Sequence, residues 1–222
     1  MIEENVKSVL SELHLLSGGN AALVAATKTR TAEEIQRAID AGITMIGENR
    51  VQEFCEKYDQ IKGAERHFIG HLQTNKVKYL IGKTDLYHSG DRDALLEEIA
   101  TRSEQKQLRS DILLQVNIGN EESKGGYPLQ EAAKAYLAWR DRAGIRICGF
   151  MAMLPLAGTD EEKETLVIKM RDLYEKIKRE DGNIRYLSMG MSGDWRLCVK
   201  GGANMVRLGT AIFGERPSFR AK

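Results

Sequence analysis

The sequence predicts an α/β protein built as a single (β/α)8 barrel of the TIM type, with one extra helix before the first strand. Eight short apolar runs alternate along the chain with longer charged segments of helical periodicity. Such alternation indicates parallel strands joined by right-handed crossovers. Eight strand–helix units within 222 residues suit one barrel, because barrels of this class commonly form a single domain of this size.

The predicted strands are short and mostly apolar, as strands buried on both faces are. They are expected at residues 22–28, 44–49, 66–72, 85–91, 111–117, 146–153, 186–190 and 205–209. A doubly wound open sheet is the alternative architecture. It is disfavoured because it usually has fewer strands and because no G-x-G-x-x-G turn follows the first run.

The segments between the runs show helical spacing. Helices are expected over residues 2–16, 31–42, 92–105, 159–181 and, in a shorter form, 194–202. The helix over 159–181 opens with threonine and acidic residues and closes with basic residues, which suits the helix dipole. No linker or low-complexity segment divides the chain. Residues 1–222 are therefore expected to form one domain.

Charge and cysteine content exclude several classes of protein. With 33 basic and 32 acidic residues the formal net charge is +1, so no general attraction to nucleic acid is expected. The three cysteines form no Cys-x-x-Cys pair, which disfavours a disulfide framework and a zinc site and indicates a reducing compartment. The N-terminus resembles neither a signal peptide nor a membrane span. We expect a cytoplasmic protein with no membrane partner.

Lys28 ends the first apolar run and is the first candidate for chemistry. Active-site groups of such barrels lie at the carboxyl ends of the strands. The two-residue period places Lys28 on the same side as Val24 and Ala26. If that side faces inward, desolvation would favour the neutral amine, which attacks aldehydes to form a Schiff base. The alternative is a lysine that only reaches solvent at a strand end.

Three further strand ends carry candidate binding residues. Asn49 follows the second run, where its amide could hydrogen-bond a ligand, although asparagine is also an ordinary turn residue. Loops after the seventh and eighth strands of barrels frequently bind phosphate. Ser192, Gly209 and Thr210 suit such a site, since glycine permits close backbone approach and hydroxyls donate hydrogen bonds. Simple helix capping is the alternative there.

Arg207 lies inside the eighth run, where a buried strand should show only apolar residues. A buried guanidinium needs an acceptor, which would be a carboxylate inside the barrel or a ring nitrogen of a ligand. A lysine, a phosphate-binding cup and an arginine aimed at a ring nitrogen together describe a site for pyridoxal 5'-phosphate (PLP).

Two histidines and a second lysine offer other candidate sites. His67 and His71 predict no metal site, because four residues along a strand span about 13 Å, too far for two ligands of one zinc ion. No metal is expected, and His88 is expected to be packed or solvated. Lys124, in a glycine-rich loop after the fifth run, is the alternative amine at the same end of the barrel.

Several strings occurring in order resemble the YggS/PROSC-type pyridoxal phosphate homeostasis proteins over roughly residues 23–216. They are TKTR, GENRVQE, HFIGHLQTNK, QVNIGNEESKGG, GFMAMLP, SMGMSGDW and VRLGTAIFG. The resemblance implies a PLP barrel of fold type III, like the N-terminal domain of bacterial alanine racemase. It implies the following contacts: Lys28 as the Schiff-base lysine, Asn49 beside the cofactor ring, Arg207 near the pyridine nitrogen, Ser192, Gly209 and Thr210 around the phosphate, and Met189 and Met191 along the neighbouring wall. The stretch GGAN before Arg207 departs from the family, which usually has serine and threonine there.

The favoured function is a non-catalytic protein that holds PLP as a lysine Schiff base and acts in its homeostasis or delivery, with PLP-dependent apo-enzymes as candidate recipients. A PLP-dependent amino-acid racemase is the alternative. It would need a second acid/base opposite the lysine, which in related alanine racemases is a tyrosine from a second domain. Only 13 residues follow the last predicted strand here. An arginine at the ring nitrogen also weakens the electron sink, although related racemases function with such an arginine.

A Schiff-base aldolase acting on a sugar phosphate is a third possibility. It would need a carboxylate at the mouth, for which Glu48 is the candidate. The resemblance implies a monomer or weak dimer, and it leaves open which apo-enzymes or metabolites exchange with the bound cofactor.

Overall fold

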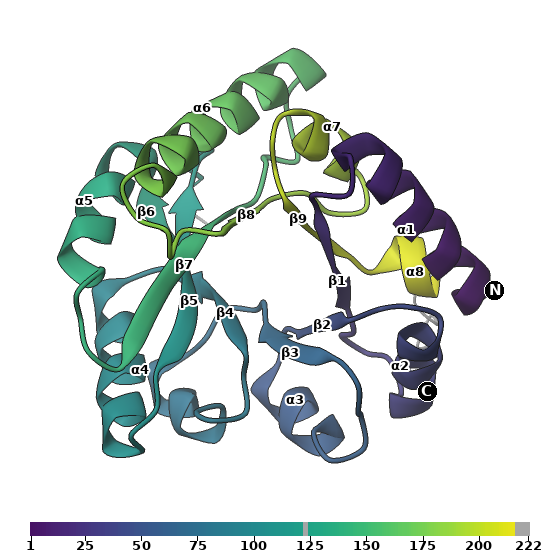
Figure 1. The fold of residues 1–222 in the computed structure, drawn as a ribbon, viewed down its shortest axis with the longest axis horizontal. Helices are drawn as coiled ribbons and strands as arrows, with labels where there is room; N and C mark the ends of the chain where they lie inside the picture. The colour runs from purple at the N-terminus through teal and green to yellow at the C-terminus, as the bar shows by residue number, and fades with distance from the viewer. Residues whose placement is uncertain (122–123, 216–222) are drawn as a thin grey trace.

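The computed structural model describes residues 1–121 and 124–215 and shows a closed parallel barrel ringed by helices (Figure 1). Its strands are β1 (Ala22–Ala26), β2 (Met45–Glu48), β3 (Glu65–Phe68), β4 (Leu86–Gly90), β5 (Ser110–Asn117), β7 (Ile145–Ala152), β8 (Tyr186–Ser188) and β9 (Met205–Leu208). Each strand pairs in parallel with the next, and β9 pairs with β1 to close the sheet. The predicted (β/α)8 barrel is confirmed. A two-residue strand that was not predicted, β6 (Tyr127–Pro128), pairs with the end of β5.

Helices cover the outside of the barrel. They are α1 (Ile2–Ser17), α2 (Ala32–Asp40), α3 (Val51–Lys57), the 3-10 helix η1 (Thr74–Tyr79), α4 (Asp93–Gln105), α5 (Leu129–Trp139), α6 (Asp160–Lys178), α7 (Trp195–Lys200) and α8 (Thr210–Phe213). The extra helix α1 packs on α2, α7 and α8. Both α2 and α6 begin with a capping box, at Thr31 and Thr159. Within the described part of the chain, no helix has the length and apolar character needed to cross a membrane.

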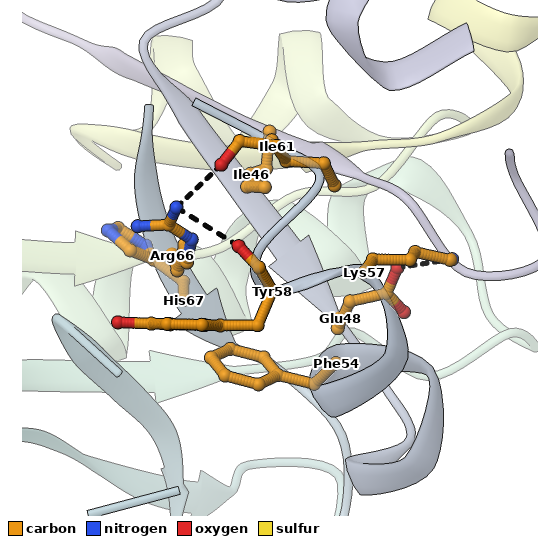
Figure 2. Close-up of a pocket in the computed structure, with 8 residues that line it drawn as sticks. All are labelled: Ile46, Glu48, Phe54, Lys57, Tyr58, Ile61, Arg66 and His67. Carbon is orange, nitrogen blue, oxygen red and sulfur yellow. Dashed lines mark hydrogen bonds and ion pairs between the residues drawn. The ribbon is translucent and has the colours of Figure 1, made fainter. Parts of the chain in front are cut away.

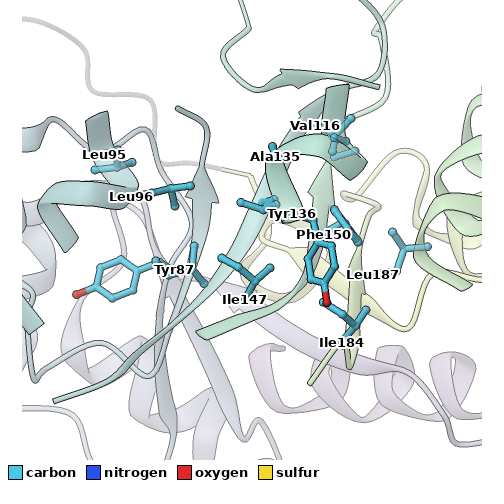
Figure 3. Packing of buried hydrophobic residues seen from close by; sticks show 14 of the residues in the cluster. Tyr87, Leu95, Leu96, Val116, Ala135, Tyr136, Ile147, Phe150, Ile184 and Leu187 are labelled. Carbon is cyan, nitrogen blue, oxygen red and sulfur yellow. The ribbon is translucent and has the colours of Figure 1, made fainter. Parts of the chain in front are cut away.

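The apolar core forms two layers on either side of the strands. Inside the barrel lies a small cluster that includes Val24, Leu113 and Met205. Outside it, larger clusters fill the space between strands and helices, and Figure 3 shows the part between β4, β5, β7 and helices α4 and α5. On β1, Val24 belongs to the inner cluster, whereas its neighbours Leu23 and Ala25 belong to an outer one. The inward direction that the period of two predicts for this strand is therefore present.

Seven of the eight strands end earlier than predicted, by one to four residues, and the first and the third are examples. The first ends at Ala26 rather than at residue 28, although Thr27 N–H still donates to Gly47 O at 2.9 Å. The third ends at Phe68 rather than at residue 72. Beyond it, Gly70 passes so close to the backbone of Asn49 that the chain must leave the sheet there. Beyond Phe68 the apolar residues Ile69 and Leu72 continue into the connection, so hydrophobicity alone does not mark the last paired residue there.

Candidate functional site

The residue that the sequence singles out first, Lys28, lies in the turn directly after β1 and is partly buried. The next residue, Thr29, has a positive φ of 65°, a left-handed conformation that a β-branched residue rarely adopts. Its N–H donates to Glu53 Oε2 at 2.7 Å, which holds this turn against α3. A strained backbone next to a candidate reactive lysine is typical of functional sites.

Asn49 lies at the end of the neighbouring strand. Ala26 of β1 and Gly47 of β2 are register partners. Lys28 and Asn49 each lie two residues beyond this pair, so they lie at the same level of the barrel. The side-chain Oδ1 of Asn49 is buried and has no hydrogen-bond partner among the described residues. Because an unsatisfied buried carbonyl costs about 1–3 kcal/mol, this oxygen is suited to accept a hydrogen bond from a ligand. The residues present thus fit a ligand that carries a donor at this position.

On the other side of β1, the end of β9 supplies the predicted glycine turn. A Cβ atom on Gly209 would lie 3.5 Å from the Cβ of Ala26, so this glycine is adjacent to the end of β1. Thr210 begins α8 and is exposed. Lys28, Asn49 and Gly209 therefore follow three neighbouring strands at the carboxyl end of the barrel, where this fold carries its chemistry.

Ser192 lies in the turn between β8 and α7, and is partly buried. This turn is fixed by Gly190, whose φ is 103° and whose Cβ would come within 2.8 Å of the Trp195 Cα. Its carbonyl accepts the Arg207 N–H at 3.0 Å, which ties the turn to β9. The two predicted phosphate-binding segments are therefore neighbours, as a shared anion would require.

Arg207 points into the barrel from β9, beside Val24 of β1, and only 5% of it is exposed. Its acceptors are not carboxylates: Nη1 donates to Ser188 O at 2.9 Å and to Ser188 Oγ at 2.7 Å, and Nη2 donates to Ala152 O at 3.3 Å. Burial lowers the pKa of the guanidinium to about 10, which leaves it charged at neutral pH. A guanidinium has more N–H donors than these three bonds use, so it can also bind an acceptor on a ligand.

Met189 is placed differently from the other predicted contacts. Its side chain is fully buried in the outer cluster, together with Leu187 and Cys198. Because Ser188 points inward, the next residue of the strand points toward the helices. Any contact of Met189 with a ligand at the mouth would therefore come from its backbone.

Glu48 also faces away from the mouth. It lies between β2 and α3, where its Oε1 accepts a hydrogen bond from Lys57 Nζ at 2.8 Å (Figure 2). The same oxygen accepts from Thr27 Oγ1 at 2.8 Å. Burial raises the pKa of this carboxyl, although the Lys57 ammonium opposes the shift. This position does not suit the acid/base that an aldolase would need at the mouth.

The alternative amine, Lys124, donates to Leu154 O at 3.3 Å and forms an ion pair with Glu121. These contacts hold it at the loop that follows β7.

A cleft of about 610 Å³ begins at Asn49 and extends over α3 and η1, where Arg50, His71 and Lys76 line it.

Three polar residues of the barrel interior were not predicted to act in the site. Ser188 holds the Arg207 guanidinium, His88 lies against Ser188, and His67 lies against His88. The available signal was the alternation along each strand, which places polar residues at inward positions that apolar residues usually occupy. Among the described residues no group of three or more histidine, cysteine, aspartate or glutamate side chains could hold a metal ion.

Comparison with known proteins adds to this geometry. Residues 2–217 match the family model described as the alanine racemase N-terminal domain. Among curated proteins, the chain is 40% identical over 199 residues to the pyridoxal phosphate homeostasis protein of Aquifex aeolicus, a match that covers 88% of this chain and 87% of that protein. It is 34% identical over 200 residues to the protein of the same name from Escherichia coli K12, covering 87% of this chain and 85% of that one.

Solved structures give the same pattern. PipY of Synechococcus elongatus with PLP bound superimposes with a TM-score of 0.84 at 29% identity, covering 96% of this chain and all (100%) of that one. An alanine racemase of Clostridium difficile superimposes with a TM-score of 0.77 at 12% identity, covering 97% of this chain and 57% of that one. At that identity the second likeness shows the fold alone.

Proposed function

The chain belongs to the alanine racemase N-terminal domain family and, within it, to the pyridoxal phosphate homeostasis proteins, and from this premise we propose that it holds PLP as a Schiff base on Lys28 and serves PLP homeostasis and delivery without substantial catalysis. The observation that carries the proposal is the convergence of Lys28, Asn49 and Gly209 at one end of three neighbouring strands, beside the buried Arg207. A relative with this fold, PipY, has been solved with PLP bound.

Each residue of the site has a separate task in this proposal. PLP supplies an aldehyde, which condenses with an amine with loss of one water, and an electron-withdrawing ring. Lys28 supplies the amine, from the turn in which Thr29 has its positive φ. Asn49 Oδ1, which is buried without a partner, accepts a hydrogen bond from a donor on the ligand.

The remaining residues bind the two other ends of the ligand. Arg207 donates to the ring nitrogen with N–H groups that Ser188 and Ala152 do not use. Ser192, Gly209 and Thr210 bind the phosphate through hydroxyl and backbone N–H groups. The backbone of Met189 lies at the base of the same turn. No metal takes part.

The relatives favour a homeostasis function over racemisation, since those from Aquifex aeolicus and Escherichia coli are named pyridoxal phosphate homeostasis proteins. The Arg207 guanidinium, which remains charged at neutral pH, would keep a ring nitrogen bound to it unprotonated and so would weaken the ring as an electron sink. A racemase also needs a second acid/base opposite the lysine. Of the candidate tyrosines, Tyr87 is buried in the cluster outside the barrel, and Tyr127 donates to Asp93 at 2.7 Å. We propose that the protein acts in the cytoplasm, as a monomer or weak dimer, with apo-enzymes among its recipients.

The site is tested by reducing the PLP-treated protein with borohydride and mapping the modified peptide. We expect a yellow protein with the pyridoxyl group on Lys28, and no fixed label in Lys28→Ala. Lys124→Ala is the matched control and should label normally. A label on Lys124 in the unaltered protein would move the site, and a protein that stays colourless with added PLP would overturn the proposal.

The functional class is tested with the loaded protein. We expect transfer of PLP to an apo-enzyme and no measurable interconversion of amino-acid enantiomers. Efficient racemisation of any amino acid, lost in Lys28→Ala, would establish the racemase alternative instead.

A further inference from the structure

A continuous chain of buried hydrogen bonds crosses the barrel interior beneath the proposed site. Arg207 Nη1 lies 2.7 Å from Ser188 Oγ, and Ser188 Oγ lies 3.2 Å from His88 Nδ1. His88 Nε2 lies 3.0 Å from His67 Nδ1. The last link joins His67 Nε2 to Glu65 Oε2 at 3.3 Å, at the opposite end of the barrel. Ser188, His88 and His67 are at most 1% exposed, whereas the Glu65 side chain is 58% exposed.

Elementary donor rules give this chain of hydrogen bonds a single direction, from Arg207 to Glu65. Arg207 can only donate, so Ser188 Oγ accepts from it. The serine hydroxyl then has one proton of its own, and its other partner is His88 Nδ1. A buried hydroxyl proton needs an acceptor, which requires His88 Nδ1 to carry no hydrogen.

The same rule continues through both imidazoles. Burial lowers the pKa of His88 well below its ordinary value, so its ring is neutral and carries its hydrogen on Nε2. That hydrogen is donated to His67 Nδ1, and His67 Nε2–H is donated in turn to Glu65. Glu65 is suited to end the chain, since the bond from His67 lowers the pKa of its carboxyl and the nearby Arg185 adds to the effect.

We propose that Ser188, His88 and His67 are positioning residues that fix the orientation of the Arg207 guanidinium, and with it the donors that Arg207 presents to the ring nitrogen of a bound ligand. The inference rests on the proposed function for its ligand. It goes beyond that function because it extends the binding site through the barrel to Glu65 on the far end. Because Ser188 Oγ accepts from Arg207 and donates to His88, its orientation is set from both sides.

The first test uses the unloaded protein and does not depend on PLP. Nitrogen-15 NMR of the imidazole rings distinguishes the two neutral tautomers from each other and from the charged form. We expect both rings, those of His67 and His88, to carry a hydrogen on Nε2 and none on Nδ1. A hydrogen on Nδ1 of either ring would overturn the one-way chain.

The second test measures how the hydrogen-bond chain affects PLP affinity and absorption. Ser188→Ala removes the link between Arg207 and His88, and we expect PLP to bind about tenfold more weakly, with a shifted visible absorption maximum, because a hydrogen bond from a charged donor is lost. We also expect the His88 tautomer to become mixed in this variant. Ser103→Ala is the matched control: it removes another buried serine hydroxyl, which bonds Ser110 at 2.8 Å outside the chain.

The outcomes separate the two proposals. If the unaltered protein fails to bind PLP, the proposed function is wrong. The imidazole spectra still decide whether the hydrogen-bond chain is present. If PLP binds and Ser188→Ala behaves as Ser103→Ala does in both affinity and absorption, the positioning role is wrong. Should Ser188→Ala not fold, His88→Leu provides the affinity and absorption readouts, since it removes both ring nitrogens and with them the link to Ser188.

Discussion

Gly70 lies against the backbone of Asn49: a Cβ atom on Gly70 would be 2.1 Å from the Asn49 carbonyl oxygen. No side chain fits at that distance, so the connection after β3 constrains Asn49, the residue that follows β2. The Asn49 side chain, with its unpartnered Oδ1, owes its position at the mouth to this contact.

Gly70→Ala is therefore expected to affect both stability and binding. The backbone of Asn49 must move, and overpacking of this kind lowers the free energy of unfolding by about 1–3 kcal/mol. We expect PLP affinity to fall as well. Urea denaturation and a spectroscopic PLP titration measure the two effects. Gly182→Ala is the control, because a Cβ there meets nothing within 4 Å; equal behaviour of the two variants would contradict the prediction.

Thr29 provides a test of stored backbone strain. Asparagine tolerates its φ of 65° better than a β-branched residue does, so Thr29→Asn should raise the free energy of unfolding by about 1 kcal/mol. Thr29→Val keeps the branched Cβ and should leave stability unchanged within about 0.5 kcal/mol. Chemical denaturation of the three proteins decides; a loss of stability in Thr29→Asn would show that the turn is not strained.

The strand positions could be predicted because each buried strand is a short apolar run, and the inward direction of Val24 followed from the period of two. The same period, applied from Ser188, would have placed the Met189 side chain outside the barrel. The sequence contains no comparable signal for the two-residue strand β6, which has a proline as its second residue.

The hydrogen-bond chain inside the barrel could not be predicted from the sequence, for a different reason. His88 and Ser188 are 100 residues apart, and they meet only because β4 and β8 face each other across the closed barrel. Likewise, the arginine in the eighth run indicated a buried acceptor, but the choice between a carboxylate and the Ser188 and Ala152 carbonyls depends on where strand ends meet. Local patterns predict which residues face inward; they do not predict which of them touch.

Lys57 is expected to be essential to stability rather than to binding. Its ammonium bonds Glu48, Glu53 and the Thr27 carbonyl, and Glu48 is only 4% exposed. Lys57→Met would leave the Glu48 carboxylate buried without its cation, at a cost of about 3–5 kcal/mol. The double variant with Glu48→Gln removes that charge and should recover part of the loss. Denaturation of the single and double variants measures this, and a double variant no more stable than Lys57→Met would contradict it.

Acid is expected to destabilise the packing of α1 at a higher pH than it destabilises the barrel. Hydrogen bonds from Arg37 lower the pKa of Glu3 to about 2, and those from Arg196 lower the pKa of Glu12. These pairs join α1 to α2 and α7. A carboxyl with a depressed folded-state pKa binds more protons when unfolded, so its stabilisation is complete above the ordinary value of 4.5 and is lost as the pH falls toward about 2.

The measurement is the hydrogen-exchange protection of α1 amides, corrected for intrinsic exchange rates, at about pH 6 and about pH 3. We expect α1 protection to decrease at the lower pH while β5 and β7 stay protected. In the Glu3→Gln/Glu12→Gln variant, α1 should already be less protected at the higher pH and should change little on acidification, because the groups that titrate are gone. An unaltered protein whose α1 and barrel strands lose protection together would show that these two ion pairs do not hold the helix in place.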